Sequence, residues 1–400
     1  MTGTSSKNSK AKAVVALLIA MTLCGQWLFF SHLHDLTLGW RTFLPGLTIF
    51  GSAFLLAWGS EVLQFDIPRT LAFAFVALVA ILPEYAVDIY FAWQGGKDPA
   101  YVQYALANMT GANRILIGVG WTLVVFAYVL RSRRGEIMLE EGHRVEMMGL
   151  VFATLYAFIL PLKGSISLVD SVILFTIFGI YLRSAIKANV VEPELEGGPV
   201  ELMATLVSWK RRCAALALFI LAGAGILTAA EPFAEGLLEV GAQWGVDQFI
   251  MVQWIAPLAS ESPEFLIATI FALRNKPTAG LSTVISSMIN QWTLLVGALP
   301  IAFCLSAGVI QPMVMDARQV EEIFLTAAQS FFAMIVVINL HFRWWEAVLL
   351  FVLFATQIFF PSTSARYGFA CVYLALALIA LITSRGTRQS IPKALKVLFR

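Results

Sequence analysis

Twelve apolar runs, separated by short polar segments, are the feature that most restricts how this chain can fold. A helix rises about 1.5 Å per residue, so about 20 apolar residues cross the ~30 Å hydrocarbon core of a bilayer. Hydrophobic residues make up 59% of the 400 residues and charged residues only 13%, whereas roughly 25% is usual for soluble domains. We therefore predict an all-α polytopic membrane protein. The predicted spans are 13–31, 43–64, 69–93, 103–130, 145–162, 165–186, 211–240, 247–273, 278–308, 319–340, 344–360 and 367–384.

The basic residues between the runs predict the orientation of the chain. If the N-terminus is cytoplasmic, twenty-one of the 27 Lys and Arg residues fall in cytoplasmic segments and five in outer ones. Short cytoplasmic loops favour such an excess of basic residues. We expect an integral protein of the cell membrane with both termini in the cytoplasm. The first run lacks a small-residue cleavage site, so we expect it to be retained as a helix.

Composition and missing motifs argue against several classes of protein. The net charge is only +2 and the basic residues are scattered, so we expect the bilayer, and no nucleic acid, as a partner. The four Cys residues have no spacing typical of a disulfide framework or a zinc site. A nucleotide-binding loop and a His-Glu-x-x-His motif are both absent from the sequence. These absences argue against a primary pump and against an intramembrane hydrolase.

Two of the apolar runs contain a proline followed directly by a glutamate. The pairs are Pro83-Glu84 and Pro263-Glu264. Proline interrupts a helix, and a carboxylate inside a lipid-spanning run is costly. Finding the same costly pair twice predicts one intramembrane site that is built from two related halves.

The halves match beyond these pairs. Asn113 and Gly120 correspond to Asn290 and Gly297, with the same interval of seven residues. In the predicted topology the two Pro-Glu spans run in opposite directions, so the halves are predicted to be inverted repeats with broken helices near the midplane of the membrane. The predicted parts are an N-terminal segment with one additional helix (1–42), a first five-helix repeat (43–186), a cytoplasmic linker (187–210), a second repeat (211–360), and an additional helix with a basic tail (361–400).

At these residues the chain resembles the calcium/cation antiporter superfamily, in particular the membrane region of sodium/calcium exchangers. The family pattern is Gly-Thr-Ser-Leu-Pro-Glu on one helix and Gly-Asn-x-Ile-Gly-Ser-Asn on the next, in two inverted repeats. Here the first half reads Val-Ala-Ile-Leu-Pro-Glu at 79–84 and Ala-Asn-Met-Thr-Gly-Ala-Asn at 107–113. The second half reads Ala-Ser-Glu-Ser-Pro-Glu at 259–264 and, more loosely, Ser-Ser-Met-Ile-Asn-Gln at 286–291.

The resemblance covers about residues 43–360 and implies a function. It implies a secondary-active cation antiporter that works by alternating access, without enzymatic activity and without a cofactor. The transported ions would be small inorganic cations such as Ca²⁺, Na⁺ or H⁺.

The resemblance also implies the residues of the site. Glu84 and Glu264 correspond to the two central carboxylates that bind the metal cation, and carboxylate oxygens are ligands that hard cations prefer. The other residues predicted to bind ions or couple their movement are Asn108, Asn113, Arg114, Ser260, Glu261, Ser287 and Gln291. An alternative for the serines and amides is that they only bond the backbone inside a helix bundle.

The chain departs from the family pattern in its first half. Ala80 and Ile81 replace the hydroxyl pair of the first motif, and Ala112 replaces the serine of the second. The loss of these oxygen ligands favours one cation exchanged against protons, for example sodium/proton exchange, or an exchanger of reduced stoichiometry. A transport-dead relative with a structural or sensing role is a further alternative.

Arg114 is the most unusual residue of the predicted site. The match between the halves places it opposite Gln291, inside an apolar span. A buried guanidinium needs a carboxylate. We predict that its partner is Glu84, Glu261 or Glu264, so that Arg114 takes the place of one cation. The alternative is a shifted helix on which Arg114 reaches an aqueous edge.

Glu261 is an acid at a position where the family has serine. It lies three residues before Glu264, and this spacing on a helix predicts that both carboxylates share one face. Two acids crowded in this way predict a group that binds and releases a proton.

Overall fold

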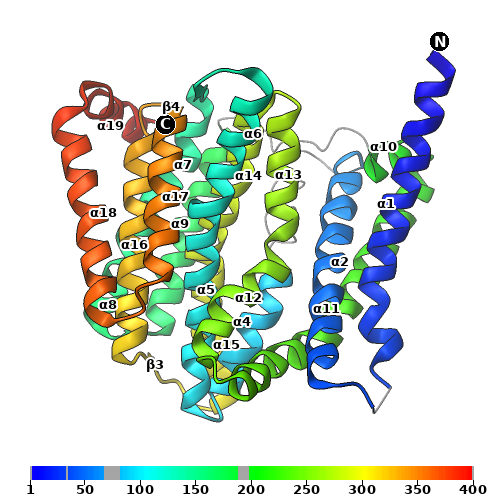
Figure 1. Ribbon diagram of the computed structural model, residues 1–400, viewed down its shortest axis with the longest axis horizontal. Helices are drawn as coiled ribbons and strands as arrows, with labels where there is room; N and C mark the ends of the chain where they lie inside the picture. The colour runs from blue at the N-terminus through cyan, green and yellow to red at the C-terminus, as the bar shows by residue number, and fades with distance from the viewer. Residues whose placement is uncertain (1, 33–34, 67–81, 188–197, 399–400) are drawn as a thin grey trace. The chain divides into compact units, whose positions relative to one another are not determined.

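The computed structural model describes residues 2–32, 35–66, 82–187 and 198–398. In this part of the chain nearly all residues are helical (Figure 1). The helices form two compact units. Unit 1 consists of Met1–Tyr90 and Pro193–Pro263, and unit 2 of Phe91–Glu192 and Glu264–Arg400. Each unit therefore takes helices from both halves of the chain.

Unit 1 is built on the long helices α2 and α11. Its helices are α1 (Thr2–Phe30), α2 (Leu38–Gln64), α10 (Pro199–Ala204), α11 (Ser208–Trp244) and α12 (Gln248–Ser260), together with the start of α4 (Leu82–Gly95) and the first residues of α13 (Ser262–Leu273). The helices α2 and α11 approach closely, since a Cβ atom added at Gly236 would lie 2.4 Å from Oγ1 of Thr42. Small residues at such contacts let membrane helices pack tightly.

An ion pair joins the C-terminal end of α2 to the N-terminal end of α11. The guanidinium of Arg211 donates hydrogen bonds to both carboxylate oxygens of Asp66, at 2.7 and 2.9 Å. Asp66 follows the end of α2, outside the apolar span. The hydrogen bond from Arg211 holds the pKa of the Asp66 carboxyl below its usual value.

Unit 2 contains the remaining elements. They are η1 (Pro99–Tyr101), α5 (Val102–Ile115), η2 (Leu116–Trp121), α6 (Thr122–Ser132), β1 (Glu136–Met138), η3 (Glu141–His143), α7 (Arg144–Ala157), α8 (Ile159–Lys163), β2 (Ser165–Ile166), α9 (Leu168–Lys187), α14 (Pro277–Asn290), η4 (Gln291–Leu295), α15 (Val296–Ala307), β3 (Met313–Val314), α16 (Ala317–Val337), β4 (His341–Arg343), α17 (Trp344–Ile358), α18 (Thr363–Thr383) and α19 (Arg385–Leu398).

Two short antiparallel ribbons show the symmetry of unit 2. The ribbon β1–β4 pairs Ile137 with Phe342, and the ribbon β2–β3 pairs Ser165 with Val314. The offset of 177 residues that relates Asn113 to Asn290 also relates Ile137 to Val314 and Ser165 to Phe342. The same offset therefore converts the first ribbon pair into the second.

The two ribbons lie at opposite ends of unit 2, where Figure 1 labels β4 and β3. An operation that exchanges the halves therefore also exchanges the ends of the helices. This is the inverted arrangement that the sequence predicts.

Most of the predicted spans correspond to observed helices. Nine helical segments in the described residues are long and apolar enough to cross a membrane. The predicted span 344–360 is the shorter apolar helix α17, and the span 247–273 is divided into α12 and α13. The predicted span 69–93 is described only from α4 onward, because residues 67–81 lie outside the described residues, as do residues 188–197 of the linker.

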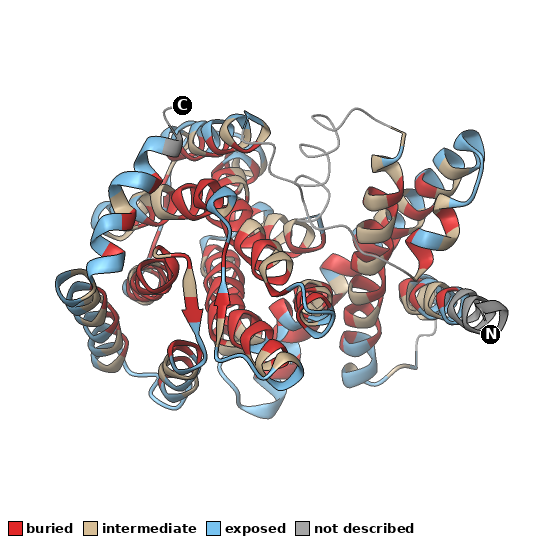
Figure 2. Ribbon diagram, turned by 90° about the horizontal axis from the view of Figure 1, so that it is seen from above, coloured by how far each residue is buried: buried red, intermediate tan, exposed pale blue. Residues whose placement is uncertain are grey.

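The helices at the centre of unit 2 are much more buried than those at its edge. Within their apolar windows, 83% of the residues are buried in α16 and in the segment from α14 to α15, against 22% in α18. In Figure 2 the buried residues lie where helices face one another, and the exposed residues point outward. The helices that contain Asn290 and Gln291 are therefore among the most buried of the unit.

Candidate ion-binding site

Both Pro-Glu pairs lie in the first described turn of a helix. Pro83 and Glu84 are the second and third residues of α4, and Pro263 and Glu264 occupy the same positions in α13. Proline fits the first turn of a helix, and a carboxylate is stabilised there by unpaired N–H groups and the helix dipole. Glu84 is buried and Glu264 is half-buried. Each predicted carboxylate ligand is thus the third described residue of its helix.

The second half contains the predicted break in a membrane helix. Helix α12 includes Pro257 and ends at Ser260, and Glu261 caps it with a backbone hydrogen bond of 2.8 Å to the Pro257 carbonyl. Helix α13 begins at the next residue. The prediction that Glu261 and Glu264 share one face of a continuous helix was wrong in its premise, because the helix is interrupted between them. The fully buried Glu261 ends one helix, and Glu264 lies in the first turn of the next.

The two Asn segments have the same local structure. In each, an α-helix passes into a short π-helix and then continues, from α5 through η2 to α6 and from α14 through η4 to α15. Inserted π turns are frequent at functional sites. The predicted residues on these segments are all buried in unit 2, namely Asn108, Asn113, Arg114, Ser287 and Gln291.

The two π segments also contact the opposite helix. Segment η2 packs against α14, and η4 packs against α5. A Cβ atom added at Gly120 on η2 would lie 3.4 Å from Cγ1 of Val284 on α14 and 3.0 Å from the Phe265 ring. The helices that contain the predicted amides therefore cross at close range.

Hydrogen bonds leave oxygen atoms of predicted ligands available. The side-chain amide of Asn113 donates to the Met109 carbonyl at 3.0 Å, and its buried oxygen accepts no hydrogen bond from the described residues. The Ser260 hydroxyl donates to the Ala256 carbonyl at 3.4 Å. Because the hydroxyl is the donor in this bond, the lone pairs of its oxygen can still bind a cation. Such oxygens suit a hard cation. Within the described ranges, no group of three or more His, Cys, Asp or Glu side chains is placed to hold a metal ion.

Arg114 has a partner that the sequence analysis did not name. Its guanidinium pairs with Glu322 on α16, and the two side chains are 3% and 2% exposed. Arg366 on α18 forms an ion pair with the other Glu322 oxygen, with its Nε at 2.7 Å, and also pairs with Glu321. The prediction of Glu84, Glu261 or Glu264 as the partner missed this acid. Two arginines and two glutamates thus form a buried cluster without net charge.

The amide of Gln329 extends this cluster to the backbone of the predicted site. It donates to the Arg114 carbonyl at 3.2 Å. The signal for the cluster in the sequence is the pair Glu321-Glu322 inside a predicted span. A second buried acid, Glu146 on α7, accepts a hydrogen bond from Ser282 on α14 and was also not singled out.

Comparisons with known proteins agree with these features. The chain matches the model of the family described as sodium/calcium exchanger protein over residues 12–187 and 214–363. It is 42% identical to the H⁺/Ca²⁺ exchanger CAX, whose crystal structure it matches with a TM-score of 0.92 over 97% of this chain and 98% of that chain. A search of curated protein sequences finds no match.

Two more distant structures share the fold. The sodium-calcium exchanger NCX_Mj is 20% identical, with a TM-score of 0.53 over 80% of this chain and 97% of that chain. The protein YfkE is 16% identical, with a TM-score of 0.58 over 91% and 99%. The matched family segments cover both halves of the chain, and the helices, the inversion and the repeated motifs are those of a membrane exchanger. The chain therefore belongs to the sodium/calcium exchanger family and is an integral membrane cation antiporter.

Proposed function

We propose that this antiporter exchanges a divalent cation, Ca²⁺, against protons, and that Glu84 and Glu264 bind both ions in turn. The observation that supports this most is the recurrence of a Pro-Glu pair in the first described turn of a helix in each half. The 42% identity with the H⁺/Ca²⁺ exchanger CAX over nearly the whole chain supports the choice of ions. We place the antiporter in the cell membrane, and the bias of basic residues supports a cytoplasmic position for both termini.

The charge of two carboxylates suits this exchange. Two ionised glutamates are neutralised equally by one Ca²⁺ or by two protons. A site that is neutral with either ion avoids a bare charge in the membrane during both halves of the cycle. Metal binding to carboxylates displaces protons, so the two ions compete for the same oxygens.

Sodium is the less favoured counter-ion. Sodium sites need several oxygen ligands beyond the shared carboxylates, and the sequence has Ala80, Ile81 and Ala112 where the family pattern has hydroxyl residues. Residues 80 and 81 lie outside the described residues. Ala112 is buried on α5, next to Asn113. Its methyl group offers no ligand at this position.

The pairing of Arg114 supports a structural role for this residue. Its charge is compensated by Glu322, inside a cluster that also contains Arg366 and Glu321. We infer that Arg114 holds α5 against α16 and does not take the place of a transported cation. This inference favours an active exchanger over a transport-dead relative.

Calcium uptake into liposomes that contain the purified protein tests the proposal. Radioactive calcium is supplied outside, and either a pH gradient or a sodium gradient is imposed across the membrane. We expect uptake when the lumen is acidic, and no stimulation by luminal sodium. Uptake driven by sodium alone would contradict proton coupling, and the absence of uptake under every gradient would favour a transport-dead relative.

A further inference from the structure

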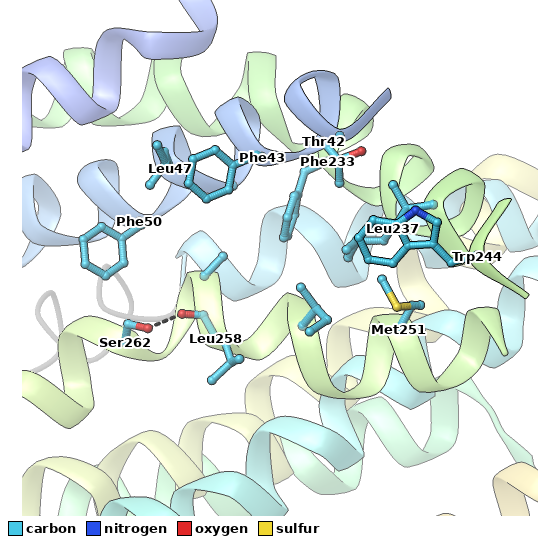
Figure 3. Close-up of a pocket in the computed structure, with 15 residues that line it drawn as sticks. Thr42, Phe43, Leu47, Phe50, Phe233, Leu237, Trp244, Met251, Leu258 and Ser262 are labelled. Carbon is cyan, nitrogen blue, oxygen red and sulfur yellow. Dashed lines mark hydrogen bonds between the residues drawn. The ribbon is translucent and has the colours of Figure 1, made fainter. Parts of the chain in front are cut away.

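Unit 1 contains an elongated apolar groove of about 490 Å³ (Figure 3). This volume is within the range of small-molecule pockets, roughly 300–1,000 Å³. Its walls come from α2, α11, α12 and the first residue of α13. The lining residues are Gly39, Thr42, Phe43, Gly46, Leu47, Phe50, Phe233, Leu237, Val240, Trp244, Met251, Ile255, Leu258, Ala259 and Ser262.

The groove offers almost no polar atoms to an occupant. The Thr42 hydroxyl donates to the Leu38 carbonyl at 3.0 Å, and the Ser262 hydroxyl donates to the Leu258 carbonyl. The second bond is drawn in Figure 3, and it joins the first residue of α13 to the last turn of α12. The third polar group is the indole N–H of Trp244, at the end of α11. A water molecule needs two to four polar partners, so this lining favours a hydrocarbon.

The length of the groove corresponds to one leaflet of a bilayer. Gly39 and Phe50 lie eleven residues apart on α2, which is about 16 Å along a helix. Half of a ~30 Å hydrocarbon core is about 15 Å. The end near Trp244 is marked by an exposed tryptophan, the residue that typically stands at the membrane interface. The groove therefore extends from an interface towards the middle of the membrane.

We propose that the groove binds one acyl chain of a membrane phospholipid, from the leaflet that borders Trp244. The exposed side chains of Phe43 and Leu258 form part of its rim, so that a chain can enter from the bilayer. The occupant is held by apolar contact along its whole length. Selection then depends on chain length and shape.

The inner end of the groove adjoins a segment of the proposed function. Leu258, Ala259 and Ser262 line the groove, while Ser260 and Glu261, between them in the sequence, are buried. These residues form the interruption between α12 and α13. If the proposed function holds, a bound chain supports this interruption from the lipid side, and its removal changes the rate of exchange.

Photochemical labelling of the full-length protein tests lipid binding without relying on transport. The probe is a phosphatidylcholine with a diazirine within one acyl chain, mixed into phosphatidylcholine liposomes that contain the protein. After irradiation, mass spectrometry locates the adducts. We expect several-fold more adducts at Leu237 and Met251 than at Ile220 and Leu227, which are exposed on α11 outside the groove. Equal labelling of both pairs would overturn the proposal.

Filling variants supply the second part of the test. An added Cβ atom at Gly39, which lines the groove, meets no atom within 4 Å, so Gly39→Leu places a side chain in its outer end. Gly223→Leu is the matched control, because Gly223 has the same free space on α11 outside the groove. Leu47→Trp fills the middle of the groove and serves if the first variant folds poorly.

We expect both filling variants to lose the groove adducts several-fold and to change the calcium uptake rate, whereas Gly223→Leu behaves as the native protein. Unchanged adducts in both filling variants would overturn the binding site. If the groove adducts are lost but calcium uptake is unchanged, the claim that a bound acyl chain affects the rate of exchange would be overturned. If the native protein shows no uptake, the labelling still decides whether a lipid binds, so failure of the proposed function and failure of this site are distinguishable.

Discussion

Arg114 on α5 and Glu322 on α16 form an ion pair in the interior of unit 2, although 208 residues separate them in the sequence. Glu322 also forms an ion pair with Arg366 on α18, at 2.7 Å. Helix α18 is thus tied by charge, through Glu322 on α16, to the helix with the predicted amide ligand Asn113. This connection explains how an arginine is tolerated within a membrane span.

Removing one member of this pair should strongly destabilise the protein. Arg114→Gln leaves part of the Glu322 charge uncompensated, and Glu322→Gln leaves two guanidinium groups beside one remaining acid, so the second change should cost more. Breaking a buried pair typically costs about 3–5 kcal/mol. Thermal unfolding in detergent measures the effect, with Glu140→Gln at an exposed position as the control. The double variant should lose less than the sum of the single changes; full additivity would mean that the two side chains are not coupled.

Gly118 on η2 should be essential for packing. An added Cβ atom there would lie 2.1 Å from Cγ of Phe354 on α17, so Gly118→Ala forces the ring or the π segment to move. Overpacking of this kind costs about 1–3 kcal/mol. Gly179→Ala is the matched control, because a Cβ at Gly179 meets nothing within 4 Å. Equal melting temperatures for the two variants would show that η2 has room that the structure does not indicate.

The pair of Asp66 and Arg211 predicts a dependence of stability on pH. Because the pKa of Asp66 is lowered in the folded protein, its contribution is present above the ordinary Asp pKa of about 3.9 and is lost as the pH falls through the lower folded value. Asp66→Asn should therefore lower the melting temperature at neutral pH, and its difference from the native protein should shrink in acid. The exposed Asp35 supplies the control variant Asp35→Asn. A difference that is constant from pH 7 to pH 3 would contradict the ionic origin.

Hydrophobic run length and repeated motifs predicted most of the fold. The runs gave the membrane helices because each long helix in lipid must satisfy its own backbone. The match of Asn113 with Asn290 gave the offset that relates the ribbons and, within a few residues, the π segments. A local pattern of this kind survives in the sequence because each half repeats it.

Other features depend on contacts that no local pattern contains. The ribbons have only two or three residues per strand, and their pairing depends on segments as far apart as Ile137 and Phe342. The partner of Arg114 was missed because Glu322 occupies a helix outside the family motifs. The proline at position 263 predicted an interrupted helix. The prediction that Glu261 and Glu264 share one helix face did not take this interruption into account. The meeting of Glu84 and Glu264 at the midplane stays a prediction.

Proton movement that accompanies calcium entry tests the central claim most directly. Liposomes that contain the protein and a luminal pH dye receive external Ca²⁺, with an ionophore to cancel any membrane potential. We predict that the lumen becomes alkaline as about two protons leave for each Ca²⁺, and that Glu84→Gln and Glu264→Gln each abolish the response while the protein remains folded. Calcium entry without a change of luminal pH, or a normal response in Glu264→Gln, would contradict the account.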